Sequence, residues 1–257
     1  MRHQLAVGIA LIGLVAGACN KPDSDALRVG IEAKYPPFES VNAAGGFEGF
    51  DIDLVQALGA SMGRPVEFRD MAWDALIPEL QAGRIDLICS GMSYTEERAR
   101  TVDFSNPYAR SPMSVLVSTT RAKDVTTVAQ LNAETSQIAV QRGTTGEAKA
   151  RAAFPKARLM VFDTEADAAR EVASGRFHAF VYDYLSVDKF AKQYPETTRV
   201  LAESIGAEEY CMVMAKGSPL RAKVNAFLET AGKPGGQIDE IMKKWLPSPE
   251  KLRPNPK

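Results

Sequence analysis

The sequence has 257 residues, of which 45% are hydrophobic and 25% are charged, and this balance excludes disordered and fibrous proteins. Its 31 basic and 32 acidic residues leave a net charge of −1, so no overall field favours nucleic acid. With two histidines, three cysteines and no C-x-x-C pair, a histidine-rich metal site is excluded and a cysteine-based one is disfavoured. We therefore expect no metal, no cofactor and no nucleic-acid partner.

The N-terminal segment has the pattern of an export signal. A basic start is followed by an uncharged stretch, Gln4–Ala18, that ends in small residues before Cys19. This stretch is too short to favour a membrane-spanning helix, which needs about 20 residues. Small residues directly before a cysteine resemble the lipobox of bacterial lipoproteins. We therefore expect a signal peptide over 1–18, a lipid on Cys19 and a tether over 19–26, with an ordinary signal peptide as the alternative.

Export would place the mature protein in the cell envelope, on the periplasmic or extracellular side, and in contact with a membrane only through the lipid anchor. Cys89 and Cys211 both lie in apolar, strand-like runs. Two cysteines of an exported protein can form a disulfide, but buried reduced cysteines are also common. Both interpretations remain open for this pair.

Short runs rich in Val, Ile and Leu alternate with amphipathic stretches along the rest of the chain. One such stretch is Ile52–Met62, whose hydrophobic residues recur at helical spacing. Alternating strands and helices predict an α/β fold with mostly parallel sheets. The predicted strands are Leu27–Glu32, Val66–Met71, Ile85–Ser90, Met113–Ser118, Gln137–Gln141, Leu159–Phe162, Ala179–Tyr182, Arg199–Ala202 and Tyr210–Ala215.

Two segments, Glu79–Cys89 and Glu171–Val181, echo one another. In each, a helix is predicted to end at a glycine before a buried strand. We interpret this as two lobes built on one α/β plan, with chance similarity as the alternative. Ligands of open α/β sheets bind beyond the carboxyl ends of the strands, which makes the residues after these two strands candidate site residues. They are Ser90, Gly91, Tyr182 and Asp183.

Arg98 stands near the start of a predicted helix. Ser93 followed by Glu96 has the spacing of a capping box, which predicts that a helix begins there. The helix dipole disfavours an arginine in a first turn, and a planar guanidinium group can hold a carboxylate through two hydrogen bonds. Arg98 is therefore a candidate carboxylate ligand, with an exposed pair to Glu96 or Glu97 as the alternative.

The segment Gln141–Glu147 lies between a predicted strand and the helical stretch Ala148–Phe154, and it includes Thr144 and Thr145. Glycines and small hydroxyl residues at a helix N-terminus present backbone N–H groups to an anion. Phosphate and carboxylate are served equally well by this arrangement.

The order of the motifs resembles that of the extracellular solute-binding proteins, family 3, which serve ABC importers of polar amino acids. The resemblance runs from about Leu27 to Pro247. It implies a two-lobe periplasmic-binding-protein (Venus flytrap) fold with two hinge crossovers, near Val117-Ser118 and Ala207–Glu209. The motifs are Glu32-x-x-Tyr35-Pro-Pro-Phe38, Gly49-Phe50-Asp51-Ile52-Asp53-Leu54, Trp73-Asp-Ala-Leu, Ser90-Gly-Met-Ser93-x-Thr95-x-Glu-Arg98 and Asp103-Phe104-Ser105-x-Pro107-Tyr108. The expected domains are lobe 1 over 25–117 plus 209–247, lobe 2 over 118–208, and a C-terminal tail over 248–257.

The resemblance also implies roles for individual residues. Arg98 would clamp the α-carboxylate of an amino acid and Asp183 its α-ammonium group. Tyr35 and Trp73 would flank the ligand side chain, whereas Asp51 and Asp53 would be structural, at the start of a helix. Glu32 stands where relatives have aspartate, so its contact with the ligand is left open. The predicted ligand-binding residues are Glu32, Tyr35, Trp73, Ser90, Gly91, Ser93, Arg98, Gln141, Thr144, Thr145, Tyr182 and Asp183.

The resemblance implies a monomeric, non-enzymatic binding protein that closes on an α-amino acid and delivers it to the membrane permease of an ABC importer. Glu32 between Tyr35 and Trp73 favours a basic side chain, with polar side chains next, because a cation pairs with a carboxylate and stacks on aromatic faces. The alternatives are a periplasmic dehydratase on the same fold, similar to cyclohexadienyl dehydratase, a receptor input domain, and a structural envelope lipoprotein.

Overall fold

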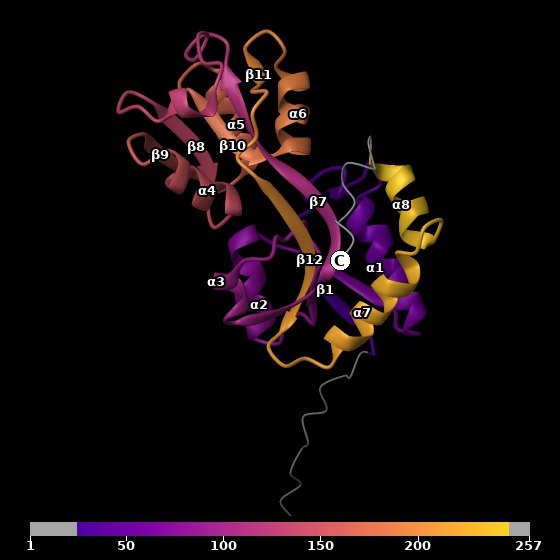
Figure 1. The fold of residues 1–257 in the computed structure, drawn as a ribbon. Coiled ribbons are helices and arrows are strands. Elements are labelled where there is room, and N and C mark those ends of the chain that lie inside the picture. The colour runs from indigo at the N-terminus through magenta and orange to yellow at the C-terminus, as the bar shows by residue number, and fades with distance from the viewer. Residues whose placement is uncertain (1–24, 247–257) are drawn as a thin grey trace, which may run out of the picture.

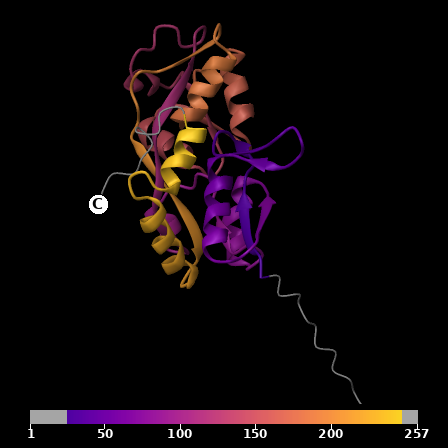
Figure 2. The ribbon, with the colours of Figure 1, turned by 90° about the vertical axis from the view of Figure 1, so that its right-hand side faces the viewer.

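The computed structural model describes residues 25–246 (Figure 1), and the predictions for the signal peptide, Cys19 and the tail lie outside them. Two groups of elements are stacked one above the other, with two long strands running between them (Figures 1 and 2). The strands that run between the groups are β7 (Val102–Ser118) and β12 (Ala207–Ala215).

The first group contains both ends of the described chain. Its strands are β1 (Leu27–Ile31), β2 (Lys34–Tyr35), β3 (Glu39–Val41), β4 (Phe47–Glu48), β5 (Val66–Asp70) and β6 (Leu87–Ile88). Its helices are α1 (Phe50–Ser61), α2 (Leu76–Gln81), α3 (Glu96–Ala99), α7 (Leu220–Ala231) and α8 (Gln237–Trp245), with a 3₁₀ turn over Trp73–Ala75.

The second group is formed by the middle of the chain. Its strands are β8 (Gln137–Gln141), β9 (Arg158–Phe162), β10 (Ala179–Asp183) and β11 (Thr198–Val200). Its helices are α4 (Thr145–Ala153), α5 (Glu165–Ala173) and α6 (Tyr184–Gln193), with a 3₁₀ turn over Val128–Leu131.

A single nine-stranded sheet connects the two groups. Its strand order is β5-β1-β6-β12-β7-β10-β8-β9, with β11 also paired to β7, while β2, β3 and β4 form a separate small sheet. β7 pairs with β12 up to Pro112 and with β10 from Met113 onward. The long strand therefore changes its partner between these two residues, and one continuous backbone belongs to both groups.

The expectation of mostly parallel sheets is correct only for part of the sheet. β1 pairs in parallel with β5 and β6, and β8 pairs in parallel with β9 and β10. β7 and β12, however, pair antiparallel with each other and with their other neighbours. One strand enters the second group and the other returns from it, so the two run in opposite directions. Local sequence carries no signal of strand direction. The predicted strand Met113–Ser118 covers only the last third of β7.

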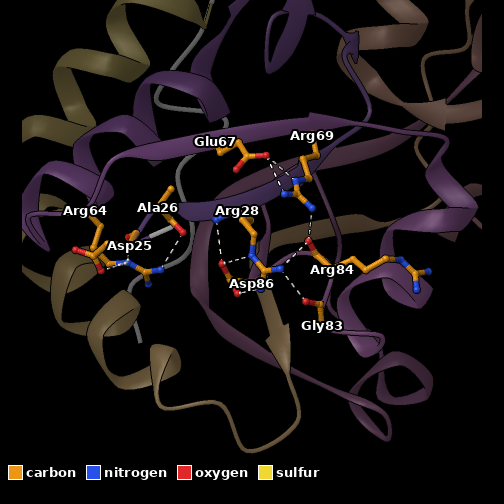
Figure 3. Close-up of polar contacts among 9 residues, drawn as sticks. All are labelled: Asp25, Ala26, Arg28, Arg64, Glu67, Arg69, Gly83, Arg84 and Asp86. Carbon is orange, nitrogen blue, oxygen red and sulfur yellow. Dashed lines mark hydrogen bonds and ion pairs between the residues drawn. The ribbon is translucent and has the colours of Figure 1, made fainter. Parts of the chain in front are cut away.

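The first group is held together by helices on its sheet and by a polar network at the N-terminal ends of the strands. α1 packs against α7 and α8, and α2 packs against β1 and β6. Arg28 Nε donates to Asp86 at 3.0 Å near the start of β1 (Figure 3). Arg28 Nη1 and Arg69 Nη1, the latter from the second half of β5, donate to the Arg84 carbonyl at 3.1 and 2.6 Å. These bonds align β1, β5 and the approach to β6, whose opposite ends point toward the other group.

The two echoing segments form the same corner in both groups. Gly83 follows α2 with φ +69°, and Gly175 follows α5 with φ +74°. The next residue, an arginine in each case, pairs back with the helix through Arg84–Glu79 and Arg176–Glu171. The predicted helix–glycine–strand corner is therefore confirmed in both places.

Cys89 and Cys211 are both buried, and no disulfide joins them in the described region. Buried reduced cysteines are thus the interpretation that the structure supports. Between residues 25 and 246, no helix combines the length and hydropathy that crossing a membrane requires.

Candidate functional site

A pocket lies where the carboxyl ends of strands from both groups face one another. We call it the central pocket. With the exception of Gln141, every predicted ligand-binding residue lines it, and Glu39 lines it in addition. The lining residues are Glu32, Tyr35, Glu39, Trp73, Ser90, Gly91, Ser93, Arg98, Thr144, Thr145, Tyr182 and Asp183.

Arg98 enters the central pocket from the short helix α3. Thr95, not Ser93, caps this helix, because its hydroxyl accepts from the Arg98 N–H at 3.1 Å. The predicted Ser93–Glu96 capping box is therefore wrong: Ser93 is held in an extended bridge to Tyr210. Ser93 contributes its carbonyl oxygen, which accepts from Arg98 Nη1 at 2.8 Å.

The guanidinium group of Arg98 is partly buried and has no carboxylate partner among the described residues. Both of its side-chain hydrogen bonds go to backbone carbonyls, Ser93 O and Gly143 O, and it forms no ion pair within residues 25–246. Desolvation lowers its pKa, an effect that the nearby Glu208 carboxylate opposes. A partly desolvated cation without an anionic partner favours an incoming anion at this position.

Trp73 packs beside this guanidinium group. The Arg98 Cζ atom lies 5.4 Å from the centre of the tryptophan ring, a distance at which cation–π attraction acts. Trp73 Nε1 also donates to the Gly143 carbonyl at 3.1 Å. The residue therefore orients Arg98 as well as lining the central pocket, and it reaches across to the second group.

The N-terminus of α4 faces Arg98 from the second group. Thr144 caps the helix: its hydroxyl accepts from the Glu147 N–H at 3.3 Å and donates to the Gln141 carbonyl at 2.8 Å. The Thr144 hydroxyl therefore makes both of these hydrogen bonds with its own segment, 141–147. Thr145 is the first helical residue, and N–H groups at that position have no partner inside a helix. The helix end presents amide donors and positive dipole to an anion.

Asp183 lies at the end of β10, on the second group's side. It occupies the N-cap position of α6, yet its side chain makes no capping hydrogen bond. The oxygen Oδ1 is buried and has no hydrogen-bond partner in the structure. Burial raises the pKa of Asp183 to about 7, although a hydrogen bond with Tyr210 opposes the shift. An unpartnered buried carboxylate oxygen is a binding position for a cation or another donor.

Glu32 and Gln141 form a second polar pair across the pocket. Gln141 Nε2 donates to Glu32 Oε2 at 3.3 Å and to the Asp163 carbonyl at 3.2 Å. Gln141 is only 1% exposed and is not among the residues that line the central pocket, so its predicted contact with a ligand stays a prediction. It acts on the pocket through Glu32, whose pKa is raised by burial and lowered by this hydrogen bond.

Tyr35 and Tyr182 form one wall of the pocket, and the buried Tyr210 supports it. The Tyr35 and Tyr210 hydroxyls are hydrogen-bonded at 2.7 Å, and the Tyr35 and Tyr182 rings meet edge to face with centroids 6.0 Å apart. Gly91 lies against this wall with φ +56°, and a Cβ atom there would come within 2.8 Å of Tyr35 Cε1. The wall thus depends on a residue without a side chain at position 91.

Glu39 is the lining residue that sequence reasoning missed. Its carboxylate accepts from the Ser90 hydroxyl at 2.6 Å. Its position directly after the Tyr35-Pro-Pro-Phe38 motif is the one feature of the sequence that points to it. No local pattern predicts its hydrogen bond with Ser90. Among the described residues, no group of three or more His, Cys, Asp and Glu side chains is placed to hold a metal ion.

Comparison with known proteins places this arrangement in a family. The family model of the bacterial extracellular solute-binding proteins, family 3, matches residues 27–248. The chain belongs to this family. The predicted resemblance is therefore confirmed over nearly the whole chain.

Relatives of this family 3 protein carry names of amino-acid-binding proteins. The ABC transporter arginine-binding protein 1 of Escherichia coli is 30% identical, over 87% of this chain and 92% of its own. The ABC transporter glutamine-binding protein GlnH of Bacillus subtilis is 31% identical, over 87% and 82%. The solved structure of the ancestral amino-acid-binding protein AncCDT-1, a precursor of cyclohexadienyl dehydratase, is 38% identical with a TM-score of 0.79, over 86% of this chain and 95% of its own.

Proposed function

We propose that this family 3 protein is the substrate-binding component of an ABC importer and that it binds α-amino acids in the central pocket. One observation carries the proposal: the unpaired guanidinium group of Arg98 and the unpartnered Oδ1 of Asp183 line the same pocket. A free α-amino acid has a carboxylate for the first and an ammonium group for the second. The Thr145 end of α4 supplies further donors to the carboxylate.

The two charged groups come from opposite sides of the pocket, because Arg98 follows β6 and Asp183 ends β10. A ligand that contacts both stabilises the arrangement in which the two sides are close. We propose that lobe 1 (25–117 plus 209–247) and lobe 2 (118–208) close in this way. The hinges would be β7 and β12. β7 leads into the second group and pairs with strands of both groups, and β12 leads back from the second group.

The ligand side chain lies between the aromatic residues and Glu32 in this proposal. Three carboxyl groups, those of Glu32, Glu39 and Asp183, line the pocket against the one guanidinium group of Arg98, so a ligand with a cationic side chain balances the pocket better than a neutral one. Of the two relatives above, one is named as an arginine-binding protein and the other as a glutamine-binding protein. Arginine or another basic amino acid is therefore the proposed ligand, with glutamine next.

The remaining parts of the proposal follow from the family. A lipid on Cys19 would tether a monomeric protein to a membrane, and the permease of the importer would receive the ligand. Catalysis is not part of the proposal. In it, the Asp183 carboxylate binds the ammonium group of the ligand and does not act as a catalytic acid. The two relatives above are also named as binding proteins. The neighbour named as a dehydratase precursor makes a cyclohexadienyl dehydratase assay the direct check.

The test is a thermal-shift screen of the protein lacking residues 1–19, refolded from denaturant to remove bound ligand, against the twenty amino acids. A ligand at about 100 times its Kd stabilises the fold by about 2.7 kcal/mol and raises Tm. We expect arginine, lysine or histidine to raise Tm, and we expect the rise to be much smaller in Asp183→Asn at the same ligand concentration. No shift with any amino acid, or turnover of prephenate-like acids, would contradict the proposal.

A further inference from the structure

Two fully buried carboxyl groups lie side by side at the central pocket, and one of them, Glu39, lines it. Glu39 and Asp51 are both 0% exposed, and each carboxyl group changes the pKa of the other. One oxygen of each, Glu39 Oε2 and Asp51 Oδ1, is buried without a hydrogen-bond partner in residues 25–246. Two carboxylates cannot hydrogen-bond without a proton between them, because each offers only acceptors.

The backbone forces this contact. Gly49, at φ +135°, precedes α1, and a Cβ atom at this position would come within 2.1 Å of the Phe38 carbonyl oxygen. This close approach lets the Asp51 N–H donate to that carbonyl at 2.9 Å. The first turn of α1 is therefore fixed against the Phe38–Glu39 segment, which places the two acids side by side.

The remaining oxygens of the pair hold the Ser90–Gly91 segment, which lines the pocket. Glu39 Oε1 accepts from the Ser90 hydroxyl at 2.6 Å, and Asp51 Oδ2 accepts from the Gly91 N–H at 2.9 Å. Asp51 Oδ2 also accepts from the Tyr108 hydroxyl at 2.8 Å. The expected helix-dipole role of Asp51 is thus secondary to these buried contacts.

We propose that Glu39 and Asp51 are positioning residues that share one proton between Oε2 and Oδ1 and so fix the direction of the Ser90 hydroxyl. The inference rests on the proposed function of the central pocket. The Ser90 hydroxyl proton is committed to Glu39, and its oxygen already accepts from the Glu32 N–H at 2.9 Å. The remaining lone pair accepts from a ligand donor, which suits an ammonium group and repels a carboxylate.

The charges around the pair agree with a retained proton. Asp51 of α1 and Glu32 at the end of β1 raise the pKa of Glu39, after burial, which is the largest cause. Tyr108 of β7 and Cys89, directly after β6, face Asp51 and supply hydrogen bonds, and the largest causes acting on the two acids include no cation. A doubly ionised pair here would have two uncompensated buried charges.

The experiment uses isosteric amides. In Glu39→Gln, the amide NH₂ replaces Oε2 and donates to Asp51, while the amide oxygen still accepts from Ser90. Asp51→Asn is the mirror case. The double variant has two NH₂ groups facing each other, so one amide must turn and present a donor where Ser90, Gly91 or Tyr108 also donates. We expect the double variant to lose at least about tenfold in affinity for the amino acid, and each single variant to lose clearly less than the double variant.

The double variant with wild-type affinity would overturn the positioning role, and single variants as weak as the double would overturn the shared proton. The proton has a second test that needs no ligand. The infrared C=O band of a protonated carboxyl should persist at about pH 8, remain in Asp183→Asn and disappear in Glu39→Gln. Its absence in wild type overturns the inference. Wild type that binds no amino acid yet shows the band refutes the proposed function alone.

Discussion

Arg98 and Gly143 join the two sides of the central pocket: Arg98 Nη2 donates to the Gly143 carbonyl at 2.9 Å. Trp73 Nε1 donates to the same oxygen at 3.1 Å. Residues that line the pocket therefore also connect the two groups of elements. Changes at either donor should affect ligand affinity through closure as well as through direct contact.

Trp73→Phe keeps an aromatic ring beside Arg98 and removes the bond to Gly143. We expect amino-acid affinity to fall by about three- to tenfold, since one hydrogen bond contributes about 0.5–1.5 kcal/mol. Isothermal titration calorimetry measures the change. Trp245→Phe is the matched control, because Trp245 Nε1 also donates once, to Asp53 at 2.7 Å, far from the pocket. Equal affinity in the two variants would contradict a closing role for Trp73.

Arg98→Lys keeps the positive charge but loses the planar pair of donors. We expect at least about a hundredfold loss of affinity, because a two-point contact to carboxylate becomes a single one and the bonds to Ser93 and Gly143 weaken. Arg84→Ala is the control, since the Arg84 side chain is 58% exposed and pairs with Glu79 on the opposite end of the sheet. Circular dichroism checks that both variants fold. If Arg98→Lys bound the amino acid with wild-type affinity, Arg98 would not be the residue that holds the ligand carboxylate.

Affinity for a neutral amino acid should rise with pH and level off above about 7. Burial raises the pKa of Asp183 to about 7, so the carboxyl group is protonated below that pH and must lose its proton to hold an ammonium group. Each pH unit below the pKa then costs up to about tenfold in affinity. The stability of the unliganded protein should change with pH in the opposite direction. The raised pKa of Asp183 stabilises the unliganded fold at low pH, and this contribution is lost as pH rises through about 7.

Asp183→Asn serves as the control for this pH dependence. Its remaining affinity should be weak and flat across the range, because the amide does not titrate. A profile that keeps its slope in Asp183→Asn would assign the titration to another group, of which Glu32 is the nearest candidate.

Glu32→Gln should change the selectivity of the pocket. We expect arginine affinity to fall at least about tenfold, because a buried cation would lose its partner. Glutamine affinity should stay within about threefold. Competition between the two ligands in a thermal-shift titration measures the ratio. Glu229→Gln, at an exposed position of α7, should leave the ratio unchanged. An unchanged ratio in Glu32→Gln as well would place side-chain selectivity elsewhere.

Gly91→Ala tests the tyrosine wall. A Cβ atom here combines a left-handed backbone with a contact of 2.8 Å to Tyr35. Gly63→Ala is the matched control, because Gly63 has φ +65° and nothing within 4 Å of an added Cβ atom. The control should lose about 1 kcal/mol from backbone strain alone. Gly91→Ala should lose clearly more in chemical denaturation and should also weaken ligand binding. Equal losses would mean that the wall yields to the added methyl group.

Much of the candidate site was predictable because its signals are local. Arg98, the Thr144–Thr145 turn and the residues that end β6 and β10 stand in short motifs, and each motif meets the pocket at the end of its strand. The capping error at Ser93 has a local cause too. Ser93 and Thr95 are both good caps, and only the bridge from Ser93 to Tyr210 leaves the cap to Thr95.

The amino-acid sequence by itself determined the α/β class, the repeated helix–glycine–strand corner and most of the pocket lining, since these follow from hydrophobic periodicity and short motifs. Only the tertiary structure decided that β7 and β12 run antiparallel between the two groups and that Glu39 meets Asp51 under Ser90. It also decided that Gln141 acts through Glu32. These features join residues far apart in the chain, and their positions follow from packing and buried hydrogen bonds, for which local sequence carries no signal.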